Sequence, residues 1–251
     1  MKISALIIAR NEQDKIERTL KSLEFADEIV IVLDRSEDET KKISRKYTNK
    51  IFSGSWNLEG DRRNFGINKC SSEWIIEIDA DEIVSEELCK EIKDKIKQDK
   101  FDFFYIPIRN YVGQRVIEFG WMACMAPDGK FSLFRKGFKY WGDGRVHPDY
   151  NVKGRKGEKF SNPIFHYMSK DISDLIGRFN KNTSLHSLDL RTQKKNLKKL
   201  FSIRKIFSRF FKCYFSRKGY RSGKIGFLVG LLCSIYPIVS AIKASKNNGE
   251  I

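Results

Sequence analysis

The stretch that decides the fold is Trp74-Ile75-Ile76-Glu77-Ile78-Asp79-Ala80-Asp81-Glu82, an apolar run that stops at two aspartates one residue apart. Short apolar runs of this kind are typical of strands buried within a sheet. Similar runs occupy residues 2–9 and 28–33, with a shorter one at 50–52. Segments with apolar residues at helical spacing separate them. This alternation predicts an α/β fold in which helices cover a mostly parallel central sheet.

The composition supports a globular protein. The chain has 251 residues, of which 41% are hydrophobic, so it can build a core and global disorder is excluded. Its five cysteines are odd in number and no two have CxxC spacing, which argues against a zinc ribbon or a disulfide framework and favours a reducing compartment. The apolar run at residues 2–9 ends directly in Arg10, without a cleavage motif, and is interpreted as a first strand rather than a signal peptide.

Positive charge gathers at the C-terminal end. Of the net +16, residues 170–251 hold +14, from 18 Lys and Arg against four Asp and Glu. We therefore predict an α/β domain over residues 1–190, with halves 1–100 and 101–190, and a basic, partly amphipathic helical extension over 191–251. Such a charge excess favours a phosphate-bearing partner, either a nucleic acid or an anionic membrane.

The extension has two parts. Residues 191–224 repeat apolar side chains at helical intervals among Lys and Arg, a pattern typical of a helix at a membrane surface. Residues 225–242 carry no charge but contain Pro237, and 18 residues is the short limit for a membrane span. We expect a helix or helical hairpin lying on the membrane. A helix that packs its apolar face on the catalytic domain remains the alternative.

Polar residues follow three of the predicted strands. Asp79 and Asp81 could together hold a divalent cation, and that cation could hold a diphosphate; a solvated acidic turn is the alternative. Arg10-Asn11-Glu12 follows the first strand, and Asp34 to Asp38 follow the second. Capping of the next helix by Ser36 would also explain the latter segment. Because ligands bind at the carboxyl ends of parallel strands, these three ends could converge on one nucleotide. Arg62-Arg63-Asn64 could add a phosphate or base contact.

These motifs resemble the family 2 inverting glycosyltransferases of the GT-A fold, and most of all the branch of lipopolysaccharide and lipooligosaccharide core β-1,4-glucosyltransferases. The resemblance covers roughly the whole chain and is most specific over residues 1–85. The matching segments are Ala5-Leu6-Ile7-Ile8-Ala9-Arg10-Asn11-Glu12, Val32-Leu33-Asp34 with Ser36, Asp38 and Thr40, Arg63-Asn64-Phe65-Gly66, and residues 73–82. A weaker block comprises Pro127-Asp128, Leu133-Phe134-Arg135-Lys136, Val146-His147 and Phe165-His166-Tyr167.

The resemblance implies roles for individual residues. Asp34 would contact the nucleotide base, Asp79 would lie near the ribose, and Asp81 would bind Mn²⁺ or Mg²⁺. The complete set expected to bind the nucleotide sugar is Ala9, Arg10, Asn11, Glu12, Asp34, Arg63, Asn64, Asp79 and Ala80. The expected metal ligands are Asp81, Asp79 and His147, whereas His166 could be purely structural.

The chain departs from the family at the expected catalytic base. The family has Glu directly after the histidine of the Val146-His147 pair, and this chain has Pro148 there, followed by Asp149. We assign the base to Asp149, with Asp143 as the reserve; either could instead be an ordinary loop acid. A second departure is Ser132, where the family commonly has Arg.

The expected activity is inverting transfer of a hexose from a nucleotide-diphosphate sugar, UDP-glucose or a similar donor. The expected acceptor is a lipid-linked glycan, such as lipopolysaccharide core or another cell-surface polysaccharide. The expected location is cytoplasmic, peripheral to the inner face of the bacterial cytoplasmic membrane, with no nucleic acid as partner. Two alternatives are a basic nucleic-acid-binding protein and an inactive membrane-tethered interaction module. The first lacks a recognisable motif, and the second leaves the intact Asp79–Asp81 pair unexplained.

Overall fold

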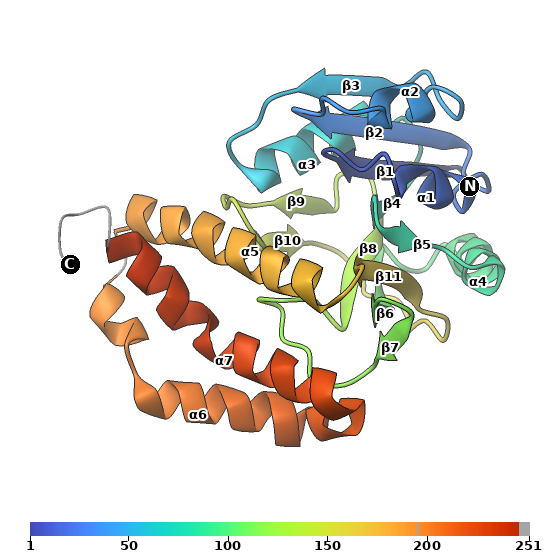
Figure 1. The fold of residues 1–251 in the computed structure, drawn as a ribbon. Coiled ribbons are helices and arrows are strands. Elements are labelled where there is room, and N and C mark those ends of the chain that lie inside the picture. The colour runs from blue at the N-terminus through green and yellow to red at the C-terminus, as the bar shows by residue number, and fades with distance from the viewer. Residues whose placement is uncertain (195, 246–251) are drawn as a thin grey trace. The chain divides into compact units, whose positions relative to one another are not determined.

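A computed structural model describes residues 1–194 and 196–245 (Figure 1). The chain forms two compact units. The first comprises residues 1–109, 129–144 and 148–166, and the second comprises 110–128, 145–147 and 167–251. This division differs from the predicted boundary at residue 190, because the C-terminal extension belongs to the same unit as residues 167–190.

The predicted strand–helix alternation is confirmed in the first unit. Two of its strands, β6 and β11, continue into the second unit. In chain order the elements are β1 (Ile3–Ala9), α1 (Ile16–Lys21), β2 (Glu28–Asp34), α2 (Thr40–Ser44), β3 (Ile51–Gly54), α3 (Glu59–Lys69), β4 (Trp74–Asp79), β5 (Glu82–Ile83), α4 (Glu86–Lys97), β6 (Phe103–Val112), β8 (Gly129–Arg135), β9 (Lys139–Trp141), β10 (Tyr150–Val152) and β11 (Ile164–Ser169). The α4 helix begins with a side-chain cap, since the Ser85 hydroxyl accepts a hydrogen bond from the Leu88 amide at 3.2 Å.

One sheet organises this unit. Its strand order is β3-β2-β1-β4-β8-β6-β11-β5. The first four strands are parallel, whereas β8 joins β4, and β6 joins β8, in antiparallel pairs. The α/β fold with parallel strands at its centre is therefore confirmed.

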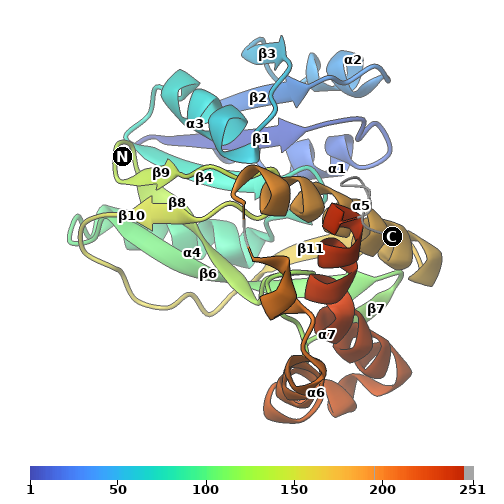
Figure 2. The same cartoon turned by 90° about the vertical axis from the view of Figure 1, so that its left-hand side faces the viewer.

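Residue alternation along the strands explains the layers. Ile3, Ala5 and Ile7 of β1 share one hydrophobic core with residues of α1 and α4. Leu6 and Ile8 point to the other face and pack in a second core that contains residues of α3. Because both faces are covered, the central strands are mostly apolar on both faces, with Ser4 of β1 and Glu77 of β4 as buried polar exceptions. Figure 2 shows α3 on one side of these strands, with α1 and α4 on the other.

The second unit is largely helical, with a strand β7 (Arg115–Ile117) paired to β6. Its helices are α5 (Ile172–Thr192), η1 (Leu197–Leu200), α6 (Ile203–Phe211), η2 (Lys212–Ser216), η3 (Gly219–Ser222) and α7 (Gly223–Ser245). The α7 helix packs against α5 and α6 (Figure 1). Leu175 and Phe179 of α5 share a core with Val229 and Tyr236 of α7.

The segment 219–245 is long and apolar enough to cross a membrane, yet half of its most apolar window is buried within the protein. Phe179 and Tyr236 meet edge to face, with ring centroids 5.9 Å apart. The Arg191 guanidinium donates hydrogen bonds to the carbonyls of Ala244 and Lys243 at 2.9 and 2.6 Å. In the structure α7 is therefore a core helix of the second unit, which matches the alternative of a packed helix for this part of the extension.

Candidate active site

The carboxyl ends of β1, β2 and β4 meet at one edge of the sheet. The register pairs Ala9 with Leu33 and Ile8 with Asp79, so Asp34 and Asp79 each end a strand adjacent to β1. This is the edge at which open α/β sheets bind ligands. The predicted convergence of three strand ends is thus present in the fold.

The loops after β1 and β2 are tied together by side chains. The Asn11 amide nitrogen donates to Ser36 Oγ at 3.1 Å, and Asn11 Oδ1 accepts from the Glu37 amide at 2.9 Å. The Glu12 amide donates to Thr40 Oγ1 at 2.8 Å. Asn11 has a φ of 55°, a left-handed conformation that asparagine tolerates better than most residues. Arg10 is exposed and Glu12 is half-buried at the start of this loop pair.

The alternative of Ser36 as a helix cap is wrong. The α2 helix begins at Thr40, and its N-cap residue Glu39 makes no side-chain capping bond. The Ser36 hydroxyl instead bonds to the β1 loop, as does Asp38 Oδ2, which accepts from the Gln13 amide at 3.1 Å. Ser36 therefore bonds to a residue distant in the sequence instead of capping the helix that follows it.

Asp34 is buried among donors. Its carboxylate binds Arg35 Nε and Arg62 Nη1, each at 2.9 Å, and accepts from the Trp56 amide at 3.2 Å. Burial by itself would raise the pKa of Asp34, but the hydrogen bond from Arg35 and the charge of Arg62 outweigh it and lower the pKa. Asp34 is thus held as a carboxylate, the form that can accept a hydrogen bond from a nucleobase N–H.

Asp79 sits between two cations. Its Oδ1 is 3.0 Å from Arg63 Nη2, and its Oδ2 is 3.2 Å from Lys130 Nζ. Lys130 also binds Glu82 Oε2 at 2.5 Å. Burial would raise the pKa of Asp79, yet the charges of Arg63 and Lys130 hold it well below its usual range. Burial and the neighbouring Asp79 raise the pKa of Glu82.

Asp81 has a different set of neighbours. Its Oδ1 is 3.5 Å from His166 Nε2, and its Oδ2 is 3.8 Å from Lys15 Nζ. The imidazole reaches this position because β11 pairs with β5, which sets His166 opposite Glu82. The structure thus places His166 against the second aspartate of the pair.

Two small residues, Ala9 and Ala80, belong to the predicted site. The Ala80 carbonyl accepts a hydrogen bond from Thr19 Oγ1 at 2.8 Å, and this bond anchors the turn between Asp79 and Asp81 on α1. The methyl groups of Ala9 and Ala80 are buried. Their assignment to the nucleotide-sugar site stays a prediction.

The metal prediction rests on few protein groups. Within residues 1–194 and 196–245, no set of three or more His, Cys, Asp or Glu side chains is arranged to hold a metal ion. Asp81 with His166 offers two donors at most. This set fits Mg²⁺ or Mn²⁺ bound chiefly by substrate phosphates, because Mg²⁺ in proteins is often held by one or two carboxylates plus phosphate oxygens. Asp79 is already engaged by Arg63 and Lys130.

His147 lies in the second unit, is exposed, and adopts a φ of 48°. Arg145, two residues earlier, binds Asp189 of α5 through its Nη1 at 2.9 Å and through its amide at 3.0 Å. The part of the loop that carries His147 is therefore fastened to α5. Its assignment as a metal ligand stays a prediction.

The β9–β10 loop carries both candidate bases. Asp143 follows β9, Asp149 precedes β10, and both side chains are exposed. The Glu59 amide donates to the Gly144 carbonyl at 2.8 Å, so the loop is bound to the start of α3. A Cβ on Gly60 would lie 2.0 Å from the Gly142 carbonyl oxygen, so only glycine permits this approach.

Two side chains of α3 connect this loop to the acidic edge. Asn64 pairs with both backbone groups of Trp141, donating to its carbonyl at 2.8 Å and accepting from its amide at 2.9 Å. Arg63 lies 4.8 Å from the centre of the Trp141 ring while it contacts Asp79 and Glu59. Asn64 thus holds β9, and Arg63 links β9 to the first aspartate of the pair.

Sequence reasoning missed Lys130 and Lys15. Lys130 lies in β8, and only the pairing of β8 with β4 brings it beside Asp79. Lys15 directly precedes α1, three residues after Glu12. Neither position has a local signal, because each cation finds its carboxylate through long-range packing.

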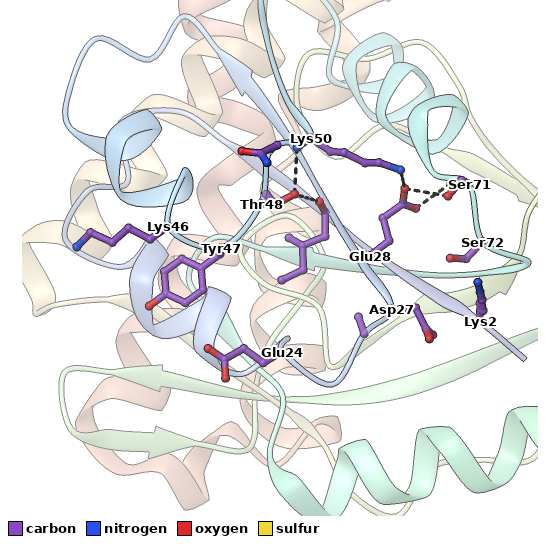
Figure 3. A pocket seen from close by; sticks show the side chains of 13 residues that line it. Lys2, Glu24, Asp27, Glu28, Lys46, Tyr47, Thr48, Lys50, Ser71 and Ser72 are labelled. Carbon is purple, nitrogen blue, oxygen red and sulfur yellow. Dashed lines mark hydrogen bonds and ion pairs between the residues drawn. The ribbon is translucent and has the colours of Figure 1, made fainter.

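A cavity of about 600 Å³ lies at the opposite, amino-terminal ends of the strands (Figure 3). Lys2, Glu28 and Lys50 line it, and Glu28 bonds Lys50 and Ser71 across it. None of the predicted nucleotide, metal or base residues lines this cavity. It is therefore separate from the candidate active site.

The sequence profile of glycosyl transferase family 2 matches residues 4–146, which include the acidic strand ends and Lys130. The chain belongs to glycosyl transferase family 2. It is 28% identical to a protein of Rickettsia bellii named as an uncharacterized glycosyltransferase, over 92% of this chain and 82% of the relative. It is 24% identical to the lipopolysaccharide core biosynthesis glycosyltransferase LpsC of Rhizobium meliloti, over 96% of this chain and 91% of LpsC.

The fold agrees with that of a solved structure. A structure of TarS 1–349 from S. aureus in complex with UDP-GlcNAc superposes with a TM-score of 0.51 at 14% identity, covering 99% of this chain and 92% of that chain. The expected GT-A fold is confirmed. The expected family and the class of the enzyme, a glycosyltransferase, are confirmed as well.

Proposed function

We propose that this family 2 glycosyltransferase transfers a hexose from a UDP-sugar to a lipid-linked glycan of the bacterial cell surface, with inversion at the anomeric carbon. One observation carries the proposal: Asp34, Asp79 and Asp81 converge at the carboxyl ends of β2 and β4, each beside one or two cationic side chains. The alternating charges suit a ligand that has a base with N–H donors at one end and a diphosphate at the other.

Asp34 is proposed to recognise the base. Its burial and low pKa keep it a hydrogen-bond acceptor, and Arg35 and Arg62 fix its orientation. The Arg62 Nε atom is buried without a hydrogen-bond partner in the described part of the chain, so it is a donor suited to a ligand oxygen. Asp79, close to Arg63, is assigned to the ribose.

Asp81 and His166 are proposed to hold Mn²⁺ or Mg²⁺ together with the diphosphate. Such a cation, when bound, neutralises charge on the departing nucleoside diphosphate. Lys15 borders Asp81 and Lys130 borders Asp79, and both would add positive charge beside the leaving group. This arrangement favours electrostatic stabilisation of the leaving group by groups that are already in place.

Asp149 is proposed as the base that takes the proton from the acceptor hydroxyl, with Asp143 as the reserve. Both are exposed on the loop that Asn64 and Glu59 fasten to α3. The hydroxyl oxygen attacks C1 of the sugar while the bond from C1 to the diphosphate oxygen breaks. A proton passes to the carboxylate, and the protein's main contribution is to position the reactants.

The acceptor class rests on the likeness to LpsC, whose name places it in lipopolysaccharide core biosynthesis, and on the basic C-terminal region. A lipid-linked acceptor implies a location at the inner face of the cytoplasmic membrane. Family membership favours this enzyme over the nucleic-acid-binding and inactive-module alternatives.

The decisive experiment measures release of UDP from UDP-glucose and UDP-GlcNAc with Mn²⁺, with Mg²⁺ and with EDTA. We expect Asp81→Asn and His166→Ala to lose at least about 100-fold in turnover, in line with the several kcal/mol that a catalytic cation supplies. Asp61→Asn, an exposed carboxylate on α3, is the matched control and should stay active. Full activity in EDTA would exclude the cation, and absence of UDP binding would overturn the donor assignment.

A further inference from the structure

The α6 helix has two apolar faces, and only one of them is packed. On the packed face, Ile206 and Phe210 are half-buried. The Phe210 ring meets Phe227 of α7 edge to face at 5.6 Å. Arg209 on the same side donates to the Cys233 carbonyl of α7 at 3.0 Å. One face of α6 thus packs against α7.

The second apolar face is exposed. Ile203, Phe207, Phe211 and Phe215 follow one another every fourth residue along α6 and η2, with exposed fractions of 73%, 70%, 60% and 49%. We call these four residues the α6 ridge. None of the nine residues of α6 is buried. A continuous exposed row of three phenylalanines and an isoleucine is unusual for a soluble surface and marks an interaction site.

The charge around the ridge identifies the partner. Between residues 191 and 249 the sequence has no Asp or Glu, whereas residues 191–224 contain 13 Lys and Arg. Several of these basic residues are exposed on α6, on the short helices that follow it and at the start of α7: Arg204, Lys205, Lys212, Lys218, Arg221 and Lys224. A second copy of the chain would bring like charges together, and a nucleic acid would leave the apolar row uncovered. A partner with an apolar interior beneath an anionic surface matches both the apolar row and the basic residues around it.

The structure also indicates which helix does not enter the membrane. The α7 helix is the more apolar of the two, but it packs against α5 and buries Val229, Cys233 and Tyr236 in the core of the second unit. Extraction of α7 would expose that core. The α6 helix can meet a bilayer while its packing on α7 stays in place, because the ridge side chains are about half or more exposed.

We propose that the α6 ridge docks on an anionic lipid bilayer. In this arrangement α6 lies along the surface, the four ridge side chains enter the boundary between headgroups and acyl chains, and the surrounding Lys and Arg contact lipid phosphates. The α7 helix remains in the protein and supports α6 from behind. The inference deepens the proposed location at the membrane, and its test needs neither the donor nor the acceptor.

The test is co-sedimentation of the full chain with phosphatidylcholine vesicles that contain or lack phosphatidylglycerol. We expect wild-type protein to bind the anionic vesicles, and Phe207→Ser with Phe211→Ser to weaken binding at least about tenfold. The matched control is Ile172→Ser with Ile176→Ser, since these α5 side chains are 47% and 46% exposed. Added salt should weaken wild-type binding without abolishing it, because apolar insertion is not screened.

Insertion depth gives a second, independent readout. Phe207→Trp should be quenched by lipids with brominated acyl chains, and Ile176→Trp should not. Equal vesicle binding by the ridge variant and wild type would overturn the proposal, and so would the absence of binding. Loss of self-association or of DNA binding in the ridge variant, with vesicle binding unchanged, would assign the ridge to those partners. UDP binding measured on the same proteins reports separately on the proposed function.

Discussion

Glu28 is expected to be one of the strongest electrostatic contributors to the stability of the first unit. It begins β2 at the edge remote from the active site, and its carboxylate accepts hydrogen bonds from Ser4 Oγ, from Lys50 Nζ and from the amide and hydroxyl of Ser71 at 2.8 and 2.9 Å (Figure 3). One side chain thereby connects β1, β2 and the segments that lead into β3 and β4. Its replacement by Gln removes the negative charge and retains the shape.

The magnitude follows from the shift in the Glu28 pKa. Burial by itself would raise it, but Lys50, Ser4 and Ser71 lower it from 4.5 to about 2. A depressed carboxylate pKa stabilises the folded state above the unfolded value of 4.5, and this contribution is lost as the pH falls toward about 2. The shift corresponds to about 3 kcal/mol. Because the Lys50 side chain is half exposed, water screens part of its interaction with Glu28. We therefore expect Glu28 to contribute about 2–3 kcal/mol to the free energy of unfolding.

Urea denaturation of wild type and Glu28→Gln from about pH 7 to about pH 3 measures this contribution directly. The difference in unfolding free energy should be about 2–3 kcal/mol at neutral pH and should narrow steadily below about pH 4.5. The control is Glu24→Gln, an exposed carboxylate on the rim of the same cavity, with an expected difference near zero. A wild-type advantage that stays constant across the pH range would refute the reasoning, since the lost interaction would then not be that of a charge.

Two further predictions concern the loop between β9 and β10. Asp149→Asn should lower kcat about 10²–10⁴-fold with donor affinity little changed, as expected for a general base that touches only the acceptor; an active Asp149→Asn with an inactive Asp143→Asn would transfer the role to Asp143. Gly60→Ala should cost about 1–3 kcal/mol of stability in thermal unfolding, because its Cβ would collide with the Gly142 carbonyl. Gly177→Ala, with open space around it on α5, should instead be neutral or slightly stabilising.

The parallel half of the fold could be predicted because its signals are local. Strands β1, β2 and β4 are mostly apolar, and the helices between them repeat apolar residues at helical spacing, so each element is recognisable from its own residues. The positions of Asp34 and Asp79 follow at once, since parallel strands end at the same edge. The Ser85 cap of α4 is local in the same way, because its partner, the Leu88 amide, is only three residues away.

The other features of the site depended on partners far apart in the sequence. Lys130 reaches Asp79 across 51 residues, and His166 reaches Asp81 only because β11 pairs with β5. Helix capping by Ser36 was one alternative that the sequence left open, but its hydroxyl accepts a hydrogen bond from the Asn11 backbone amide, 25 residues earlier. Such pairings are fixed by strand order, and no local pattern of charge or hydropathy encodes them.

The C-terminal extension shows the same limit. Its sequence alone determined that it would be basic, apolar and helical, because composition and periodicity are properties of the chain itself. Only the tertiary structure decided that α7, the more apolar helix, is buried against α5, while α6 is left with an unpaired apolar face. A hydrophobic helix stabilises a core and a membrane anchor through the same burial of apolar surface. Which of the two it forms depends on whether the rest of the fold provides a surface to cover it.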